Sequence, residues 1–313
     1  MIEVEEIALR CRDDVILQGH LWRPPAGSAG DTVIVNPATG VLARYYHRYA
    51  RFLAEAGFYV VTYDYRGIGL SRPASLRGCG YRWREWGEQD FDAALRFVLD
   101  QGWAGSVRVV GHSIGGFLPG FSPLAPAIDR MLTVGAQYAY WRDYAEAQRA
   151  RLVWKWHVVM PALTLALGYF PGRRLGWLED LPAGVAHEWS FRRRRMEASY
   201  PRRERAALLQ RFGAVTAEIL AIGLSDDPLG TPRAIERTLD YYTAAEKTRV
   251  LLTPQDFGFD AIGHFGLFHE RHRAGFWQQS LQWLKTGENP WRFAEIPHSR
   301  VRREGALELG RNA

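Results

Sequence analysis

The most constraining feature of this chain is a short hydrophobic strand that runs directly into a glycine-rich turn, in the segment VRVVGHSIGG at residues 107–116. Gly111 and Gly115 stand two residues before and two residues after Ser113, which is the G-x-S-x-G spacing. A serine at the centre of this spacing lies on a strained turn between a strand and a helix, and only small neighbours permit that turn. The segment therefore predicts that the hydroxyl of Ser113 is a nucleophile at the carboxyl end of a sheet. A dinucleotide-binding fingerprint is excluded, because G-x-G-x-x-G does not fit a serine at this position.

Hydrophobic segments alternate with helical segments along most of the chain. The first 25 residues alternate in polarity around a turn at Asp13–Asp14, which predicts a strand pair. Further strands are expected at residues 32–35, 58–63, 107–110, 130–138, 217–227 and 248–254, and helices at 43–56, 89–100, from about 232, and up to about 284. Strands separated by helices of about 10–15 residues are typical of βαβ units. The pattern predicts an α/β fold with a mostly parallel eight-stranded sheet flanked by helices.

One region interrupts this alternation. Residues 139–213 contain helix-like segments rich in Trp, Tyr and Arg, and no strand is expected among them. We expect these residues to form a helical cap, inserted after the sixth strand of a core made of residues 1–138 and 214–290. Residues 291–313 remain as a C-terminal tail, which is expected to pack loosely because the sequence is polar and basic from about Asn289.

The cap segment includes an apolar stretch at residues 152–172. A membrane span needs about twenty such residues. Lys155, His157 and Pro161 interrupt the stretch, and charges at mid-bilayer are costly. We therefore expect helices of the cap here, and no membrane association.

A serine nucleophile needs a base, and the base needs an orienting acid. On a turn of this kind the chain order is Ser, then Asp or Glu, then His. The strand AEILAIGLSDD ends in Asp226 and Asp227, and either could be the acid. The phase of the strand and the following Pro228 favour Asp227, with Asp226 as the alternative. Both could instead cap the helix that begins near Pro232.

The base is expected in the loop after the last strand. His264 lies there, between Gly263 and Phe265, before an amphipathic helix. His269 and His272 follow, but Arg273 stands where the zinc motif H-E-x-x-H needs its second histidine, so no metal site is expected. His112, beside the nucleophile, is interpreted as a packing residue.

An oxyanion hole requires two N–H donors. One is expected to be the amide of Ile114, directly after the nucleophile. The other should come from the loop at residues 36–40, where Pro37 has no N–H to donate. Ala38 is therefore the expected second donor, with Thr39 next, unless this loop is only an ordinary turn.

The cap supplies bulky aromatic side chains that either fill its own core or line a substrate site. They are Trp154, Trp156, Phe170, Trp177 and Trp189. We expect Trp154 and Trp177, together with Thr39, to contact an apolar acyl group of a small-molecule substrate.

Charge and cysteine content narrow the function classes. The net charge is +6, and much of the excess lies in an arginine-rich run at residues 191–205. Such a run is usually a solvated helix face, and no nucleic-acid-binding motif accompanies it. The two cysteines, Cys11 and Cys79, form neither a disulfide framework nor a zinc spacing, which favours a reducing compartment. The first residues show no leader, so we expect a cytoplasmic protein.

The segments NPATG, YDYRGIGLS, GHSIGG and IGHFGLF resemble the alpha/beta-hydrolase superfamily, over residues 34 to about 284. They look most like a bacterial branch of uncharacterised predicted alpha/beta hydrolases, grouped with serine aminopeptidase-like and lysophospholipase-like proteins. The resemblance implies a Ser–Asp–His triad, no cofactor, and structural roles for Asp64, Arg66 and Gly67. Asn36–Pro37 replaces the family's His-Gly pair, and the spacing from Asp227 to Pro232 is one residue longer than usual.

The sequence thus predicts a serine hydrolase that acts on carboxylic esters or thioesters through an acyl-enzyme. The same triad would serve an amidase, an aminopeptidase or an acyltransferase. A non-catalytic binding protein with this fold is the remaining alternative. The specific substrate and the oligomeric state do not follow from the sequence.

Overall fold

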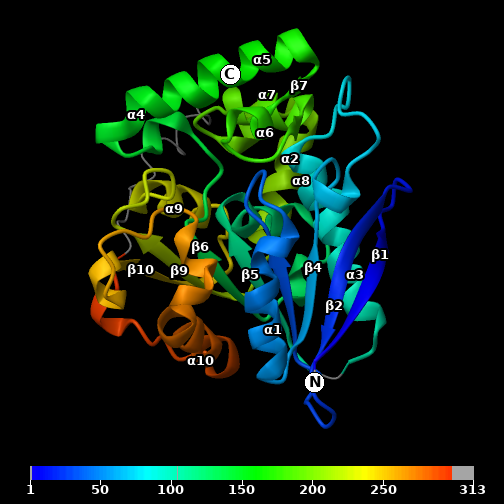
Figure 1. The fold of residues 1–313 in the computed structure, drawn as a ribbon, viewed down its shortest axis with the longest axis vertical. Helices are drawn as coiled ribbons and strands as arrows, with labels where there is room; N and C mark the ends of the chain where they lie inside the picture. Colours follow the sequence, from blue (N-terminus) through cyan, green and yellow to red (C-terminus); the bar gives the residue numbers. More distant parts are fainter. Residues whose placement is uncertain (1, 104, 298–313) are drawn as a thin grey trace, which may run out of the picture.

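The computed structural model describes residues 2–103 and 105–297 of the chain (Figure 1). Its described residues form a main sheet of eight strands in the order β1-β2-β4-β3-β5-β6-β9-β10. The strands are β1 (Glu3–Arg10), β2 (Ile16–Arg23), β3 (Thr32–Asn36), β4 (Tyr59–Tyr63), β5 (Val107–His112), β6 (Arg130–Val134), β9 (Glu218–Leu224) and β10 (Glu246–Leu252). β1 pairs antiparallel with β2, and β2 with β4, whereas the other five pairs are parallel. The predicted α/β fold is confirmed.

Each central strand contributes side chains to two hydrophobic cores, one on each face of the sheet, because successive side chains point to opposite faces. In β3, which is fully buried, Val33 and Val35 join one core and Ile34 joins the other. In β5, Val110 joins the first core and Val109 the second. Burial on both faces explains why consecutive residues such as Val33–Val35 and Val109–Val110 are apolar, without a strict alternation with polar residues.

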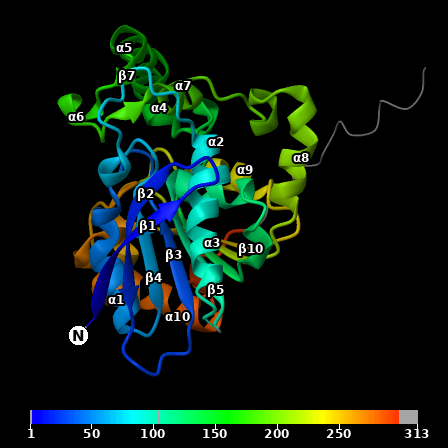
Figure 2. The same cartoon turned by 90° about the vertical axis from the view of Figure 1, so that its right-hand side faces the viewer.

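Helices cover both faces of the sheet (Figures 1 and 2). α1 (His47–Glu55) and α10 (Gln278–Thr286) pack on one face. α3 (Asp92–Asp100) and α9 (Pro232–Leu239) pack on the other. The strands and helices expected from the sequence lie within a few residues of their observed bounds.

The cap segment lies above the carboxyl end of the sheet, with one long helical arm across its top (Figure 1). Its helices are α4 (Glu146–Val153), α5 (Met160–Leu167), α6 (Gly172–Leu175), α7 (Ala183–Ser190) and α8 (Arg202–Gly213). The expectation that this segment holds no strand is wrong, because β7 (Tyr169–Phe170) pairs antiparallel with β8 (Leu181–Pro182). Two-residue strands are too short to give a period in the sequence. In the described part of the chain, no helix combines the length and apolar character of a membrane span.

Helix α8 runs down beside the core instead of staying with the rest of the cap (Figure 2). Phe212 near its end contacts the rings of Phe117 and Phe121 on the core. Gly120 makes room for this contact, since a Cβ there would lie 2.2 Å from a ring carbon of Phe212. The end of the cap segment is therefore part of the core's packing.

The start of the tail is firmly packed. Trp291 is buried, stacks on Phe276 and donates its indole N–H to Gln279. Glu295 forms a backbone bridge with Val250 of β10. The expectation of loose packing from Asn289 is therefore wrong as far as residue 297, because one large aromatic side chain anchors an otherwise polar segment. The rest of the expected tail, residues 298–313, lies outside the described residues.

Candidate active site

The turn at Ser113 has the strained geometry that its neighbours predict. Ser113 follows β5 directly and has φ +55°, in the left-handed region that residues other than glycine rarely adopt. A Cβ on Gly115 would lie 2.3 Å from the carbonyl oxygen of Asn36, and one on Gly111 would lie 2.5 Å from Cα of Gly116. Close backbone approach therefore requires both glycines. The serine is mostly buried, with 7% of its surface exposed.

His264 and Asp227 form a buried hydrogen-bonded pair. Nδ1 of His264 donates to Oδ2 of Asp227 at 2.7 Å. Oδ1 of Asp227 accepts the amides of Leu229 and Gly230 at 2.8 and 2.9 Å. Burial alone would raise the pKa of Asp227, but the attraction of His264 and these hydrogen bonds outweigh it and hold the pKa below its usual value. Because a carboxylate only accepts, Nδ1 of His264 carries a proton.

Asp226 binds the same loop at a different place. Its Oδ2 accepts the backbone amides of Ile262 and Gly263 at 2.8 and 2.9 Å, directly before His264. Of the two carboxylates that the sequence left open, Asp227 is the one that contacts the imidazole.

The capping alternative is not realised by either aspartate. The N-cap of α9 is Thr231, whose side chain accepts the amide of Ala234. The strand therefore ends in two carboxylates that both serve the loop of His264.

Ser113 and His264 line one small cavity of about 20 Å³ beneath the cap, which we call the catalytic cavity because two of the predicted catalytic residues line it. Its wall also includes Ile114, Ala38, Thr39 and Phe265. This volume has room for about one water molecule. In the described part of the chain no hydrogen bond joins Ser113 to His264. Hydrogen bonds between a nucleophile and its base are often long before substrate binds.

The oxyanion loop differs from the expectation at Ala38. Its N–H donates to the hydroxyl of Tyr46 at 3.0 Å, so it is not available as a donor to substrate. Among the described residues, the amide of Thr39 has no hydrogen-bond partner, and the amide of Ile114 lies in the first turn of the 3-10 helix Ser113–Gly116, where an N–H has no partner within the helix. Both residues line the cavity. The choice of Ala38 is therefore wrong in this geometry, and Thr39 is the available amide. The contact with Tyr46 is the physical reason.

His112 is more than the packing residue that the sequence suggested. It is fully buried, with Nδ1 at 2.7 Å from the hydroxyl of Tyr46 and Nε2 at 2.8 Å from the carbonyl oxygen of His264. Burial, and then the neighbouring His264, lowers the pKa of His112 to about 3. Tyr46 was not expected at the site, and nothing in its sequence neighbourhood signals it.

The aromatic residues of the cap differ in whether they are exposed to solvent or line the catalytic cavity. Trp154 is 63% exposed, so the expectation that it contacts substrate is wrong in this structure. It begins the helical segment Trp154–Val159 between α4 and α5, and the sequence pattern does not tell its exposed positions from its buried ones. Trp189 lines the catalytic cavity. Trp83 and Gln137 also line it, and no motif in the sequence marks them.

A larger apolar groove of about 620 Å³ adjoins the catalytic cavity. Trp177 and Leu178 of the cap line it, as do Val41 and Phe268 of the core. Phe265 lines both the groove and the catalytic cavity, so the two spaces lie next to each other at this residue. Trp177 therefore lies in a groove next to the site but not in the catalytic cavity itself.

The arginine run is only partly a solvated face. Arg192 is buried, lies over the rings of Trp83 and Tyr138, and forms an ion pair with Glu188. The next three residues, Arg193–Arg195, are exposed. Arg192 is therefore a structural residue of the cap, next to a side chain of the catalytic cavity.

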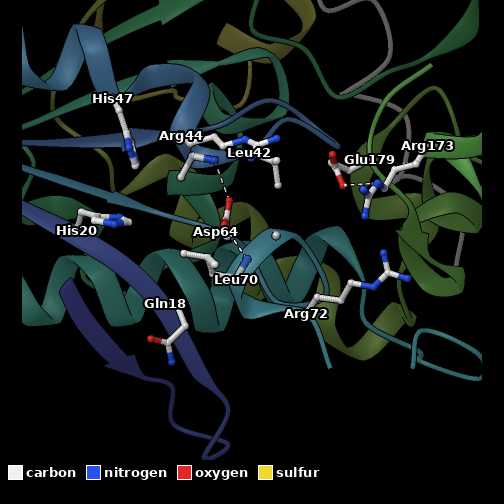
Figure 3. Close-up of a pocket in the computed structure, with 12 residues that line it drawn as sticks. Gln18, His20, Leu42, Arg44, His47, Asp64, Leu70, Arg72, Arg173 and Glu179 are labelled. Carbon is white, nitrogen blue, oxygen red and sulfur yellow. Dashed lines mark hydrogen bonds and ion pairs between the residues drawn. The ribbon is translucent and has the colours of Figure 1, made fainter. Parts of the chain in front are cut away.

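A separate polar pocket of about 280 Å³ lies between the core and the cap (Figure 3). Asp64 lies in its wall and accepts the amides of Ala43 and Leu70 at 2.7 and 2.9 Å. Burial raises the pKa of Asp64 despite these bonds. Figure 3 shows Arg173 and Glu179 of the cap across the pocket. The contacts of Asp64 hold two loops together, which is a structural use of that carboxylate.

Comparison with known proteins places this geometry among related chains. A model of the serine aminopeptidase S33 family matches residues 29–252. An esterase of Pyrococcus furiosus superposes with a TM-score of 0.58 at 15% identity, covering 91% of each chain. The alpha/beta hydrolase GrgF from Penicillium sp. sh18 gives 0.58 at 16% identity, covering 90% of this chain and 98% of its own. An acylaminoacyl peptidase of Pyrococcus horikoshii gives 0.54 at 13% identity, covering 93% of this chain and 42% of its own. These structures share the fold, and the chain itself belongs to the serine aminopeptidase S33 family of the alpha/beta-hydrolase superfamily.

Proposed function

We propose that the protein is a serine hydrolase that cleaves carboxylic esters or thioesters through an acyl-enzyme. The observation that carries the proposal is the 2.7 Å hydrogen bond between His264 and Asp227, beside a cavity that His264 shares with Ser113. A neutral imidazole oriented in this way has its free Nε2 available to accept the serine proton. The left-handed backbone of Ser113 supports the same assignment.

The proposed reaction uses these groups in two half-reactions. Nε2 of His264 takes the proton of Ser113, whose Oγ bonds to the substrate carbonyl carbon. The amides of Ile114 and Thr39 donate to the resulting oxyanion, and Asp227 stabilises the imidazolium. The C–O or C–S bond then breaks, and the leaving alcohol or thiol takes the proton from His264. Water repeats the sequence on the acyl-enzyme and releases the carboxylic acid.

The volumes of the two spaces indicate where the substrate chain lies. The catalytic cavity of about 20 Å³ has no room for an acyl chain. The apolar groove of about 620 Å³ shares the lining residue Phe265 with this cavity. We propose that the substrate's apolar chain lies in this groove against Trp177 and Leu178, and that Phe265 is displaced when the chain enters.

Cleavage of peptides from a free N-terminus is the second candidate, because the family is named for it. An aminopeptidase must bind the substrate's positively charged amino group, for which a nearby carboxylate is the natural partner. Among the described residues, no Asp or Glu lines the catalytic cavity. The groove that we propose for the substrate chain is lined by Glu179 and Glu270, so the assay on amino acid anilides below decides between the two candidates.

A fluorophosphonate probe tests the proposal directly. Labelling of the wild-type protein, its loss in Ser113→Ala and its retention in Ser280→Ala would support the assignment, since Ser280 is a buried serine outside the site. An unlabelled but folded wild-type protein would rule it out. Hydrolysis of 4-nitrophenyl esters, thioesters and amino acid anilides by the same preparations separates esterase from aminopeptidase activity.

The compartment is part of the same proposal. Cys11 and Cys79 are both free thiols. Unpaired cysteines fit a reducing environment such as the cytoplasm, where we propose that the enzyme acts.

A further inference from the structure

A continuous set of hydrogen bonds joins the oxyanion loop to the loop of the base. The amide of Ala38 donates to the hydroxyl of Tyr46 at 3.0 Å, and this hydroxyl lies 2.7 Å from Nδ1 of His112. Nε2 of His112 lies 2.8 Å from the carbonyl oxygen of His264. His112 is also the residue directly before Ser113, so the bonds meet at the turn of the nucleophile.

Only one assignment of donors and acceptors is consistent with all three hydrogen bonds. The carbonyl oxygen of His264 can only accept, so Nε2 of His112 carries the hydrogen. Nδ1 of a neutral imidazole is then an acceptor, and the hydroxyl of Tyr46 donates to it. The oxygen of Tyr46 remains free to accept from Ala38. Every group is satisfied without a charge on any of them.

The surroundings keep both side chains neutral. Tyr46 and His112 are fully buried, and the ring of Phe268 contacts each of them. Burial raises the pKa of Tyr46 well above its usual value and lowers that of His112 to about 3. Neither group therefore titrates near neutral pH, so the bonds persist across the range in which a histidine base operates.

We infer that Tyr46 and His112 are positioning residues, which hold the oxyanion loop and the backbone of His264 in fixed register with the turn of Ser113. This inference rests on the proposed function. Asp227 fixes the imidazole of His264, Asp226 fixes the two amides before it, and His112 fixes its carbonyl oxygen. On the other side, Tyr46 engages the amide of Ala38 and leaves that of Thr39 for the substrate. A displacement of about 1 Å in such a site can cost about 100-fold in rate.

The first test compares Tyr46→Phe with Tyr49→Phe. Tyr49 is equally buried, on the adjoining helix, and its hydroxyl bonds to Ser280, away from the site. With 4-nitrophenyl butyrate, we expect Tyr46→Phe to lower kcat at least about 10-fold with KM within about 2-fold, because the lost bond orients groups that act on the transition state. We expect Tyr49→Phe to keep the wild-type kcat and to lose a similar amount of thermal stability. Equal kcat values for the two variants would overturn the inference.

The second test examines the two ring nitrogens of His112 separately. His112→Gln keeps an N–H at the position of Nε2, whereas His112→Asn keeps a polar atom at the position of Nδ1 and loses the donor to His264. We expect Gln to retain several-fold more kcat than Asn, and both to keep the pH profile of the wild type. A higher kcat for Asn than for Gln, or wild-type kcat in both, contradicts the role assigned to His112. If the wild-type enzyme neither hydrolyses esters nor binds the fluorophosphonate, the proposed function itself fails. That failure is seen in the wild type, whereas failure of the positioning role is seen only when the variants are compared with an active wild type.

Discussion

Asp226 and Asp227 are adjacent in the chain but bind the loop of His264 at two different places. Asp227 accepts the imidazole N–H at 2.7 Å, whereas Asp226 accepts the amides of Ile262 and Gly263 at 2.8 and 2.9 Å. One carboxylate therefore orients the side chain, and its neighbour orients the backbone that carries this side chain. The pair explains why a strand should end in two acids where the proposed mechanism needs one.

This division predicts unequal effects of the two neutral substitutions. Asp227→Asn presents an N–H or a weaker acceptor to His264 and no longer stabilises the imidazolium, so we expect kcat to fall by about 10³–10⁴-fold. Asp226→Asn keeps an oxygen that accepts from Ile262 and Gly263, so we expect a loss of about 10-fold or less. Steady-state kinetics on 4-nitrophenyl butyrate measures both. A larger loss in Asp226→Asn than in Asp227→Asn would reverse the assignment of the acid.

The buried histidine predicts how stability depends on pH. The pKa of His112 is lowered to about 3, whereas an unfolded histidine titrates near about 6.5. Between these values the unfolded chain binds a proton that the folded chain does not, so this contribution to stability is complete above pH 6.5 and is lost as pH falls toward 3. Urea unfolding at several pH values should therefore give a slope of up to about 1.4 kcal/mol per pH unit from this residue.

His112→Gln tests how much of the pH dependence of the unfolding free energy comes from this histidine. The substitution removes one titrating group and leaves His47 and His272, whose pKa values burial lowers to about 4. We expect the free energy of unfolding of His112→Gln to fall less steeply below pH 6.5 than that of the wild type, whatever its value at neutral pH. Identical slopes would mean that His112 is protonated in the folded protein, which the hydrogen bond directions around it do not allow.

The part of the site that local patterns encode could be predicted. The spacing around Ser113 and the chain order of acid and base identified residues that the structure brings to one cavity or joins to it. The bonds of Tyr46 and His112 could not be predicted, because they join residues 66 and 152 positions apart, and the motifs around His112 and His264 do not show which groups their side chains and carbonyls contact. The choice between Ala38 and Thr39 failed for the same reason, since it depends on where the hydroxyl of Tyr46 lies.

The fold shows the same limit. Apolar runs predicted the central strands, because each is buried on both faces, and the helical period predicted the helices, because each is buried on one face. Trp291 anchors the segment after Asn289, but the polar residues around it in the sequence do not indicate an anchor. β7 and β8 are too short to have a period. Single-residue anchors and two-residue strands are determined by tertiary contacts, which a periodic pattern does not contain.

The buried ion pair of Arg66, in the loop after β4, predicts that replacing this arginine strongly destabilises the protein. The guanidinium of Arg66 is 1% exposed and forms ion pairs with Asp90 at 2.5 Å and with Asp13 at 2.6 Å. Arg66→Met leaves the buried carboxylate of Asp90 without its counter-ion, so we expect a loss of about 3–5 kcal/mol in the free energy of unfolding. Arg10→Met is the matched control, because Arg10 and its partner are mostly exposed, and such surface pairs contribute about 1 kcal/mol or less. Similar losses in the two variants, measured by urea unfolding, would show that Arg66 is not held by its buried partner.

The apolar groove predicts a dependence on chain length that Trp177 controls. Trp177→Ala enlarges the groove and removes apolar contact from a long chain, whereas an acetyl group does not reach it. Since each buried methylene contributes about 0.8 kcal/mol, we expect Trp177→Ala to lower kcat/KM for 4-nitrophenyl octanoate about 10-fold and for the acetate by less than about 2-fold. Trp154→Ala is the control, because its side chain is 63% exposed, and it should leave both values unchanged. An equal loss on acetate and octanoate in Trp177→Ala would place the acyl chain elsewhere and leave the groove without a role in substrate binding.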